Sequence, residues 1–367
     1  MVAVVLAGGG TAGHTSPLIA TAERLRDLAP DVAITCIGTA KGLETRVIPA
    51  AGLKLELVPP VPLPRKLTPD LLKVPIRLAK SVGEARRIIR AAGADVVVGF
   101  GGYVSMPAYL AARTLGIPVV IHEQNAVPGL ANKVAARFAA VVGVTFPSTP
   151  LPKARFLGMP LRRGIAQLDR PALRDSARAE LGLRREGPVL LVSGGSQGAK
   201  AINEATEGAR ASLLASGVDI LHVLGPKNFD PARHAVATDA ATGARYVPVA
   251  YVDRMEVAYA AADLMVGRSG AGTVMETAAA ALPCIFVPLP HGNGEQARNA
   301  TFIIEADAGR LVPNAELTPE RLLAEAGPLL ADADARDAMS ARLAGLVPAD
   351  AAGALARLVL GCAGRDA

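Results

Sequence analysis

One short stretch combines glycines, a helix start and a carboxylate in an order suited to binding phosphate. Residues 267–273 lie between an apolar run, 263–266, and an alanine-rich segment, 277–281, so we predict strand, turn and helix. Glycines let the backbone approach an anion, and the amides and dipole of the first helical turn favour negative charge. Glu276 lies about one turn further on, where its carboxylate could accept hydrogen bonds from a ribose diol. A tight turn with a solvated glutamate is the simpler alternative.

A second turn of the same kind, 194–199, follows the apolar run 188–192 and opens a helical segment, 202–214. Two anion-binding turns in one half of the chain could hold both ends of a nucleoside diphosphate. The polar stretch 291–299 precedes another helix and could offer Gln296 and Glu295 to sugar hydroxyls, although an exposed loop would look the same.

The first half contains its own glycine turn, Gly8 to Gly13, which matches G-x-G-x-x-G after a buried strand. Such a turn would suggest a nicotinamide or flavin dinucleotide site if an Asp or Glu ended the second strand, about 20 residues beyond the glycines. The second predicted strand, 32–37, ends instead in Gly38-Thr39. An oxidoreductase is therefore disfavoured.

Two histidines stand beside polar groups where predicted strands end. His14 closes the first turn, where a helix dipole disfavours its charged form and suits it to act as a general base. A histidine that only bonds a backbone carbonyl is the alternative. The run His122-Glu123-Gln124-Asn125 ends another strand, and such polar clusters are more often part of a site than of the scaffold. The histidines are not spaced as metal ligands, so we predict no metal and no cofactor.

Strands alternate with helices in both halves of the chain, which favours two doubly wound parallel sheets. The expected strands of the first half are 2–6, 32–37, 53–58, 95–98, 118–121 and 141–144. Those of the second are 188–192, 219–224, 246–249, 263–266 and 283–287. Ligands of such sheets bind at the carboxyl ends of the strands, so we expect twin Rossmann-like sheets facing a cleft.

Size and composition agree with two domains of ordinary size. The chain has 367 residues, of which 51% are hydrophobic and 3% aromatic, so the cores should be aliphatic. Residues 147–160 contain four prolines and resemble an interdomain linker. We place an N-terminal domain at 1–161 and a C-terminal domain at 162–348, with a helix at about 349–361 packing back on the first.

Net charge and cysteine spacing limit the kinds of ligand and cross-link that the chain is expected to have. The net charge of +6 favours an anionic partner, and scarce aromatic residues argue against nucleic acid. Cys36, Cys284 and Cys362 are too far apart to suggest a zinc site or disulfides.

No apolar run reaches the ~18 residues of a membrane span, and no signal peptide is evident, so the protein should stay in the cytoplasm. A basic, amphipathic stretch, 63–90, could lie on an anionic bilayer or simply pack on the core.

With these motifs in view, the chain resembles the MurG family, the undecaprenyl-pyrophosphoryl-MurNAc-pentapeptide N-acetylglucosaminyltransferases of peptidoglycan synthesis. The motifs that carry the resemblance, in order along the chain, are 9–14, 101–105, 122–125, 194–199 and 268–273 with Glu276. The resemblance implies the GT-B fold, with the donor UDP-GlcNAc held mainly by the second domain. It also implies that the glycine turns of the first domain meet the pyrophosphate of the acceptor, lipid I.

The resemblance also implies roles for individual residues. Those similar to first-domain and linker contacts of the donor are Thr11, Ala12, Gly13, Asn125 and Arg162. Those similar to contacts in the second domain are Ser196 for the diphosphate, Val252 for uracil, Ala271, Gly272, Thr273, Val274 and Met275 for phosphate, Glu276 for ribose and Gln296 for the sugar.

We therefore expect a hexosyltransferase that inverts the anomeric carbon of UDP-GlcNAc and builds lipid II at the cytoplasmic face of the cell membrane. His14 is the first choice for the base and Glu123 the second. The expected partners are UDP-GlcNAc, lipid I, an anionic membrane surface and, as a further option, other cell-wall synthesis proteins, but no nucleic acid. A UDP-GlcNAc 2-epimerase and a non-catalytic nucleotide-sugar-binding membrane adaptor are the alternatives.

Overall fold

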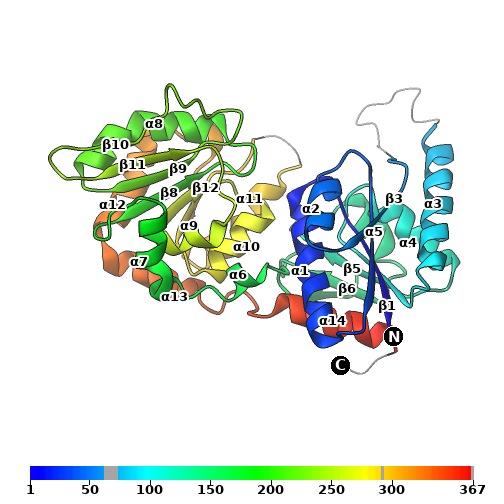
Figure 1. The fold of residues 1–367 in the computed structure, drawn as a ribbon. Helices are drawn as coiled ribbons and strands as arrows, with labels where there is room; N and C mark the ends of the chain where they lie inside the picture. Colours follow the sequence, from blue (N-terminus) through cyan, green and yellow to red (C-terminus); the bar gives the residue numbers. More distant parts are fainter. Residues whose placement is uncertain (62–72, 291–292, 365–367) are drawn as a thin grey trace. The chain divides into compact units, whose positions relative to one another are not determined.

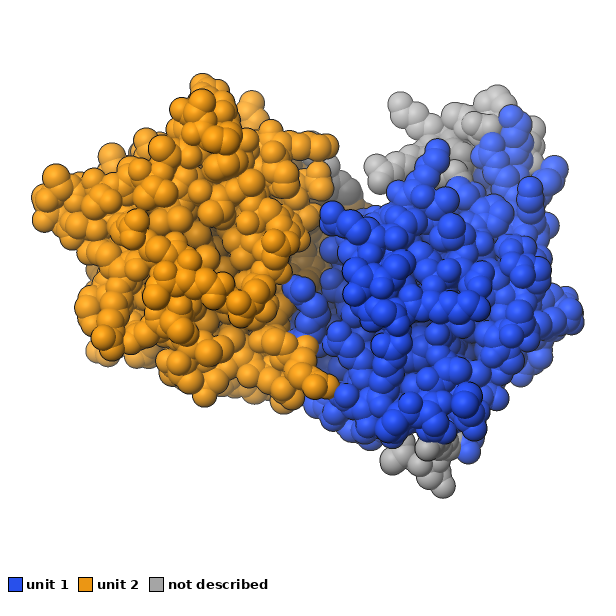
Figure 2. All heavy atoms as spheres, viewed as in Figure 1, with its two compact units in different colours: residues 1–162, 350–367 blue, residues 163–349 orange. Residues whose placement is uncertain are grey.

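The computed structural model describes residues 1–61, 73–290 and 293–364. The chain divides into two compact units, one of residues 1–162 and 350–367 and one of residues 163–349 (Figure 2). The second unit starts at Arg163, one residue after the start expected from the sequence, and the C-terminal segment from Asp350 belongs to the first unit.

The first unit is built on a seven-stranded parallel sheet in the order β3-β2-β1-β4-β5-β6-β7 (Figure 1). Its strands are β1 (Ala3–Ala7), β2 (Ala33–Gly38), β3 (Lys54–Leu57), β4 (Val96–Gly99), β5 (Val119–Glu123), β6 (Val141–Val144) and β7 (Ala154–Phe156). Its helices are α1 (Ala12–Leu28), α2 (Glu44–Ala50), α3 (Val74–Ala91), α4 (Ser105–Thr114), α5 (Leu130–Ala135) and α14 (Ala351–Cys362).

The aliphatic strands are buried on both faces, because successive side chains point to opposite sides of a sheet. Val5 of β1 joins a core with α3, α4 and α5, whereas Leu6 joins a core with α1 and α14. Helix α14 packs against α1 through Leu355 and Val359, which are fully buried. The C-terminal helix therefore completes the core of the first unit.

One prediction about the end of the first unit was wrong. The proline-rich segment 147–160, expected as a linker, contains β7, which pairs in parallel with β6 through Val142 and Ala154. The residues of β7 are exposed, which is possible in a short strand at the edge of a sheet, so the strand has no run of apolar residues that would have predicted it. The prolines flank this strand without interrupting it.

The second unit repeats this architecture in the order β10-β11-β9-β8-β12-β13-β14, with only β10 antiparallel to its neighbour among the described pairs. Its strands are β8 (Val189–Ser193), β9 (Asp219–Val223), β10 (Ala237–Thr238), β11 (Arg245–Val249), β12 (Leu264–Gly267), β13 (Cys284–Phe286) and β14 (Gly309–Leu311). Its helices are α6 (Arg163–Ala166), α7 (Arg170–Glu180), α8 (Lys200–Ala215), α9 (Met255–Ala261), α10 (Ala271–Ala279), α11 (Glu295–Glu305), α12 (Pro319–Ala331) and α13 (Ala333–Leu343), with a 3-10 turn at Asn314–Glu316.

Helix α7 was not predicted, because it has few apolar residues. Its start is nonetheless encoded locally: the Asp169 carboxylate accepts a hydrogen bond from the Ala172 amide, and Pro171 occupies the first turn. The Arg170 guanidinium donates to the carbonyl oxygens of Ala262 and Ala281, at 2.6 and 2.7 Å. Helix α7 therefore holds the ends of α9 and α10 in place.

The strand order brings the glycine turns together within each unit. In the first sheet β1 lies between β2 and β4, and in the second β8 lies between β9 and β12, so the order of the strands reverses at these central strands. Ligands of doubly wound sheets bind at this reversal, beyond the carboxyl ends of the strands. Because Ala7 pairs with Gly99 and Ser193 with Gly267, the two turns of each unit leave adjacent strand ends.

Candidate active site

The two glycine turns of the first unit meet around the imidazole of His14. His14 lies in the first turn of α1 and is half-buried. A Cβ placed on Gly102, in the turn after β4, would lie 3.0 Å from the Gly9 carbonyl oxygen and 3.4 Å from His14 Cδ2. Gly102 also has a φ of +78°, which disfavours any other residue. Glycine at this position keeps one edge of the imidazole open.

Glu44 is a residue of this site that the sequence did not reveal. Its fully buried carboxylate accepts hydrogen bonds from the Gly10 amide at 2.8 Å and from the Thr39 amide and hydroxyl at 2.9 and 2.8 Å. Burial opposes its ionisation, but these hydrogen bonds hold the pKa of Glu44 below its usual range. The Gly10 amide is thus already bonded to a carboxylate, whereas no side chain caps the start of α1, so the amides of Ala12 and Gly13 can face an anion.

His14 is linked to the end of β5 by a chain of hydrogen bonds. Its Nδ1 lies 3.0 Å from Gln124 Oε1, and Gln124 Nε2 lies 3.1 Å from Nδ1 of His122. Nε2 of His122 lies 2.8 Å from the Gly158 carbonyl oxygen. Burial lowers the pKa of His122 to about 4, against the hydrogen bond to Gly158, so this side chain is neutral at physiological pH.

Glu123, the second choice for the base, has a structural role. Its carboxylate accepts hydrogen bonds, each of 2.9 Å, from the amides of Asn125 and Gly129 and from Nδ2 of Asn132. The side chain is buried, with 2% of its residue surface exposed. A carboxylate that is enclosed and occupied in this way shapes the loop that carries Asn125 and is no longer an alternative base.

Acid is expected to destabilise both units through buried histidines. Burial lowers the pKa of His122 to about 4 and that of His222, in β9, to about 3, from an ordinary 6.5. The unfolded chain therefore binds protons between pH 6.5 and these values while the folded chain does not. Stability is complete above pH 6.5, and each unit should lose about 2 kcal/mol between pH 7.5 and 5.

Denaturant unfolding at both pH values measures this loss. His122→Asn should remove the pH dependence of the first unit only, and the matched variant His222→Asn that of the second unit only. Identical pH dependence in the wild type and both variants would contradict the assignment.

The two glycine turns of the second unit also lie side by side. Gly198 has a φ of +73°, and a Cβ there would lie 2.0 Å from the Leu224 carbonyl oxygen at the end of β9. Asn203 and Asn228 each donate to the same carbonyl at 3.0 Å, which pins the turn. Ser196 is exposed at its tip. A preorganised turn with an exposed hydroxyl at its tip is suited to binding an anion.

Helix α10 begins at the second turn with no side chain capping its first amides. Ala271, Gly272 and Thr273 supply these amides, which have no partner within the helix. The Val274 amide instead donates to the Gly270 carbonyl at 3.0 Å. The side chains of Val274 and Met275, 0% and 2% exposed, lie in the core. Any phosphate contact of Val274 or Met275 would therefore have to come from the backbone.

Glu276 is held by a tyrosine that the sequence did not indicate. The Tyr259 hydroxyl, on α9, donates to Glu276 Oε2 at 2.7 Å. Tyr259 is 1% exposed, whereas Glu276 is half-buried. A buried donor on one oxygen orients the carboxylate, which is the geometry needed to accept hydrogen bonds from a diol.

The remaining predicted contacts are spread over loops. Gln296, in the first turn of α11, accepts the Leu289 amide on Oε1 at 2.9 Å, so it would approach a sugar as an N–H donor. Val252 is half-buried between β11 and α9, and Asn125 is half-buried after β5. Arg162 is exposed at the last position before the second unit. His291 and Gly292 lie outside the described residues.

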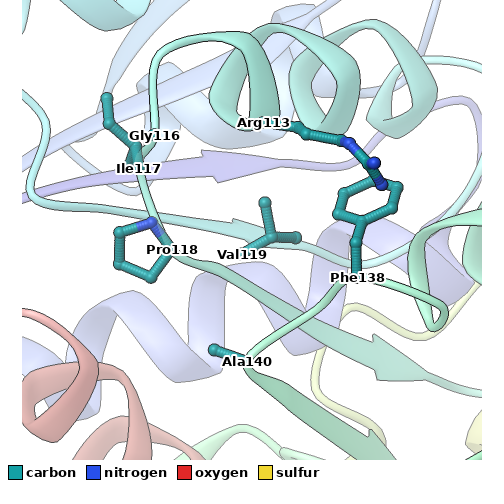
Figure 3. Close-up of a pocket in the computed structure, with 7 residues that line it drawn as sticks. All are labelled: Arg113, Gly116, Ile117, Pro118, Val119, Phe138 and Ala140. Carbon is teal, nitrogen blue, oxygen red and sulfur yellow. The ribbon is translucent and has the colours of Figure 1, made fainter.

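A separate cavity of about 270 Å³ lies at the start of β5 (Figure 3). The Arg113 guanidinium covers the Phe138 ring there, 4.7 Å from its centroid. The cavity touches Val119, the first residue of β5, whereas the residues from His122 to Asn125 lie at the other end of this strand. Across residues 1–61, 73–290 and 293–364, no cluster of three or more His, Cys, Asp or Glu side chains is arranged to hold a metal ion.

Comparison with known proteins agrees with this geometry. Residues 4–144 match the N-terminal domain of glycosyltransferase family 28, and residues 189–353 match its C-terminal domain. A Cutibacterium acnes protein named UDP-N-acetylglucosamine--N-acetylmuramyl-(pentapeptide) pyrophosphoryl-undecaprenol N-acetylglucosamine transferase is 62% identical, over 99% of this chain and 98% of its own length. A protein of the same name from Nocardioides sp. is 55% identical, over 97% of each.

The crystal structure of Acinetobacter baumannii MurG is also similar, with a TM-score of 0.80 and 29% identity, covering 98% of this chain and 100% of that one. Two Rossmann-like parallel-sheet units, as predicted, are the architecture of GT-B glycosyltransferases. By sequence over its whole length and by fold, the chain belongs to the MurG family of glycosyltransferases, within glycosyltransferase family 28.

Proposed function

We infer that this protein transfers N-acetylglucosamine from UDP-GlcNAc to lipid I, which gives lipid II for peptidoglycan synthesis. The observation that carries the inference is the meeting of two anion-binding turns at the β8–β12 strand ends, with Glu276 one turn further on. The chain's relatives over 97–99% of its length are named for this reaction.

The donor binds chiefly to the second unit in this proposal. The Ser196 hydroxyl and the amides of Ala271, Gly272 and Thr273 hold the diphosphate, and Glu276 holds the ribose. The Val252 backbone pairs with uracil, and Gln296 donates to a sugar hydroxyl. Additional donor contacts come from the first unit and its last residue, namely Thr11, Ala12, Gly13, Asn125 and Arg162.

The reaction is an inverting displacement. The C4 hydroxyl of the MurNAc residue attacks the anomeric carbon of α-linked GlcNAc, the bond to the UDP oxygen breaks, and a β-1,4 bond forms. His14 accepts the hydroxyl proton, and the helix start at Ala271 stabilises the negative charge on the departing UDP.

A coupled assay of UDP release tests the function. We expect UDP only when UDP-GlcNAc and a soluble lipid I analogue are both present, together with the β-1,4 disaccharide product. Formation of UDP-ManNAc from UDP-GlcNAc alone would identify a 2-epimerase. Binding of UDP-GlcNAc without turnover would identify a nucleotide-sugar-binding adaptor.

We also propose that the first unit lies on the anionic cytoplasmic face of the cell membrane, where it meets lipid I and other cell-wall synthesis proteins. Support comes from the first half of α3, where Ile76 is 74% exposed, beside Lys73 and Lys80. Pro75, Leu78, Ala79 and Val82 line an adjoining groove of about 590 Å³ with residues of α4. The second half is different, since Ala85, Ile88 and Ile89 are buried in the core. Residues 63–72 of the predicted basic stretch lie outside the described residues, among which no helix is long and apolar enough to cross a membrane.

Ile76→Glu should weaken binding to vesicles that contain anionic lipid. It replaces an exposed apolar side chain with a charge of the same sign as the lipid, which should cost about 10-fold or more in vesicle affinity. Sedimentation with phosphatidylglycerol vesicles measures the bound fraction. Leu173→Glu, at a 45% exposed position in the second unit, is the matched control and should bind as the wild type does. Wild-type binding by Ile76→Glu would rule out this surface.

A further inference from the structure

We propose that Gln124 is a positioning residue that holds His14 as the tautomer protonated on Nδ1, so that Nε2 is left to accept a proton. Buried His122 sets the direction of the Gln124 amide. The proposal deepens the role given to His14 above and rests on that proposed function for its catalytic meaning.

The chain of constraints starts at Gly158. A carbonyl oxygen can only accept a hydrogen bond, so His122 Nε2, 2.8 Å from the Gly158 oxygen, carries a hydrogen. His122 is 0% exposed, and burial lowers its pKa to about 4, so the ring is neutral and has one N–H. Nδ1 of His122 is therefore an acceptor.

The Gln124 amide has only one orientation that satisfies its neighbours. Its Nε2 lies 2.8 Å from the His122 carbonyl oxygen and 3.1 Å from His122 Nδ1, and both are acceptors. Rotating the amide by half a turn would place an oxygen against both of them. The amide nitrogen must face His122, and since Gln124 is 1% exposed, water does not compete for these contacts.

The opposite side of the amide then decides the state of His14. Gln124 Oε1 can only accept, so His14 Nδ1, at 3.0 Å, carries the hydrogen. In the neutral ring the lone pair is on Nε2. This edge of the ring lies along the second glycine turn, because a Cβ on Gly102 would be 3.7 Å from Nε2.

The arrangement accounts for both hydrogens of the imidazole during the transfer step. The acceptor hydroxyl proton moves to His14 Nε2 as the oxygen bonds to the anomeric carbon, and the Nδ1 hydrogen stays on the ring, bonded to Gln124. A neutral amide accepts that hydrogen bond without taking the proton. Gln124 thus orients the base and does not itself exchange a proton.

Nitrogen-15 NMR of the histidine-labelled full chain tests the tautomer directly. We expect the wild-type His14 signals, assigned by their loss in His14→Ala, to show a protonated Nδ1 and an unprotonated Nε2. In Gln124→Met the ring should shift towards the Nε2–H form, while the signals of His222, buried in the second unit, stay unchanged as an internal control of folding. An Nε2–H tautomer in the wild type overturns the proposal without any variant.

Kinetics test the consequence for catalysis. Gln124→Met should lower kcat about 10- to 100-fold with little change in KM for UDP-GlcNAc, because the base is misaligned while the donor site is intact. Gln124→Glu should not recover the loss, because its second carboxylate oxygen would face the His122 carbonyl oxygen and Nδ1, which are both acceptors. Gln167→Met, at an exposed glutamine of the second unit, is the matched control. Equal kcat in Gln124→Met and the wild type overturns the positioning role.

Failure of the underlying function has a different signature. Wild-type kcat in His14→Ala would overturn the base assignment, and with it the catalytic use of the chain of hydrogen bonds, even if the spectrum shows an Nδ1–H ring. A wrong tautomer with an inactive His14→Ala would instead overturn only the role of Gln124.

Discussion

His14→Ala is expected to lower kcat for lipid II formation about 10²- to 10⁴-fold, with KM for UDP-GlcNAc nearly unchanged. The imidazole is the basic group at the meeting point of both glycine turns of the first unit, and Glu123 is enclosed by three hydrogen-bond donors. Without His14 the acceptor hydroxyl must lose its proton to water.

Initial rates at saturating donor and acceptor analogue measure this effect. His234→Ala, which removes a half-buried histidine of the second unit, is the matched control and should keep wild-type kcat. His14 is half-buried in the first turn of α1, so truncating it should disturb the core little. A circular-dichroism melt checks that His14→Ala folds as the wild type does. Turnover within a factor of about two of the wild type would mean that His14 is not the base.

Glu276→Ala is expected to lower kcat/KM for UDP-GlcNAc about 100-fold. A carboxylate that accepts two hydrogen bonds from the ribose diol contributes about 1.5 kcal/mol or more for each, and the alanine variant loses both. Tyr259→Phe should have a smaller effect in the same direction, because it removes the donor that orients the carboxylate at 2.7 Å.

A modified donor makes this test specific for the ribose. With 2′-deoxy-UDP-GlcNAc the wild type should lose part of its activity, and Glu276→Ala should lose little more than it has lost already. Glu305→Ala, at the exposed end of α11 in the same unit, is the matched control. An unaltered KM and kcat in Glu276→Ala would refute the ribose contact.

Much of the fold was accessible from local pattern. Apolar runs alternating with amphipathic segments predicted the central strands, and β6 begins and ends where it was expected. Most other boundaries moved by about one residue, since an apolar run does not mark where pairing stops. The exposed strand β7 and the arginine-rich helix α7 were not predicted, because hydrophobic periodicity does not reveal elements that bury little apolar surface.

The residues that hold the site are a different matter. Gln124 is 110 positions from His14, and Tyr259 is 17 from Glu276 on another helix. In the sequence Glu44 looks like an ordinary first residue of a helix, yet its carboxylate accepts a hydrogen bond from the Gly10 amide. Buried polar groups take whichever partner the packing brings to them, and no spacing along the chain encodes that choice.

The sequence by itself therefore determined the class of fold, the family and the positions of the glycine turns, because glycine turns between strands and helices are local features of the chain. Only the tertiary structure decided which turns are neighbours, because strand order, with β1 beside β4 and β8 beside β12, results from long-range pairing. It also decided the orientation of the functional groups. The Gln124 amide and the Tyr259 hydroxyl direct His14 and Glu276 through contacts that exist only once both sheets are folded.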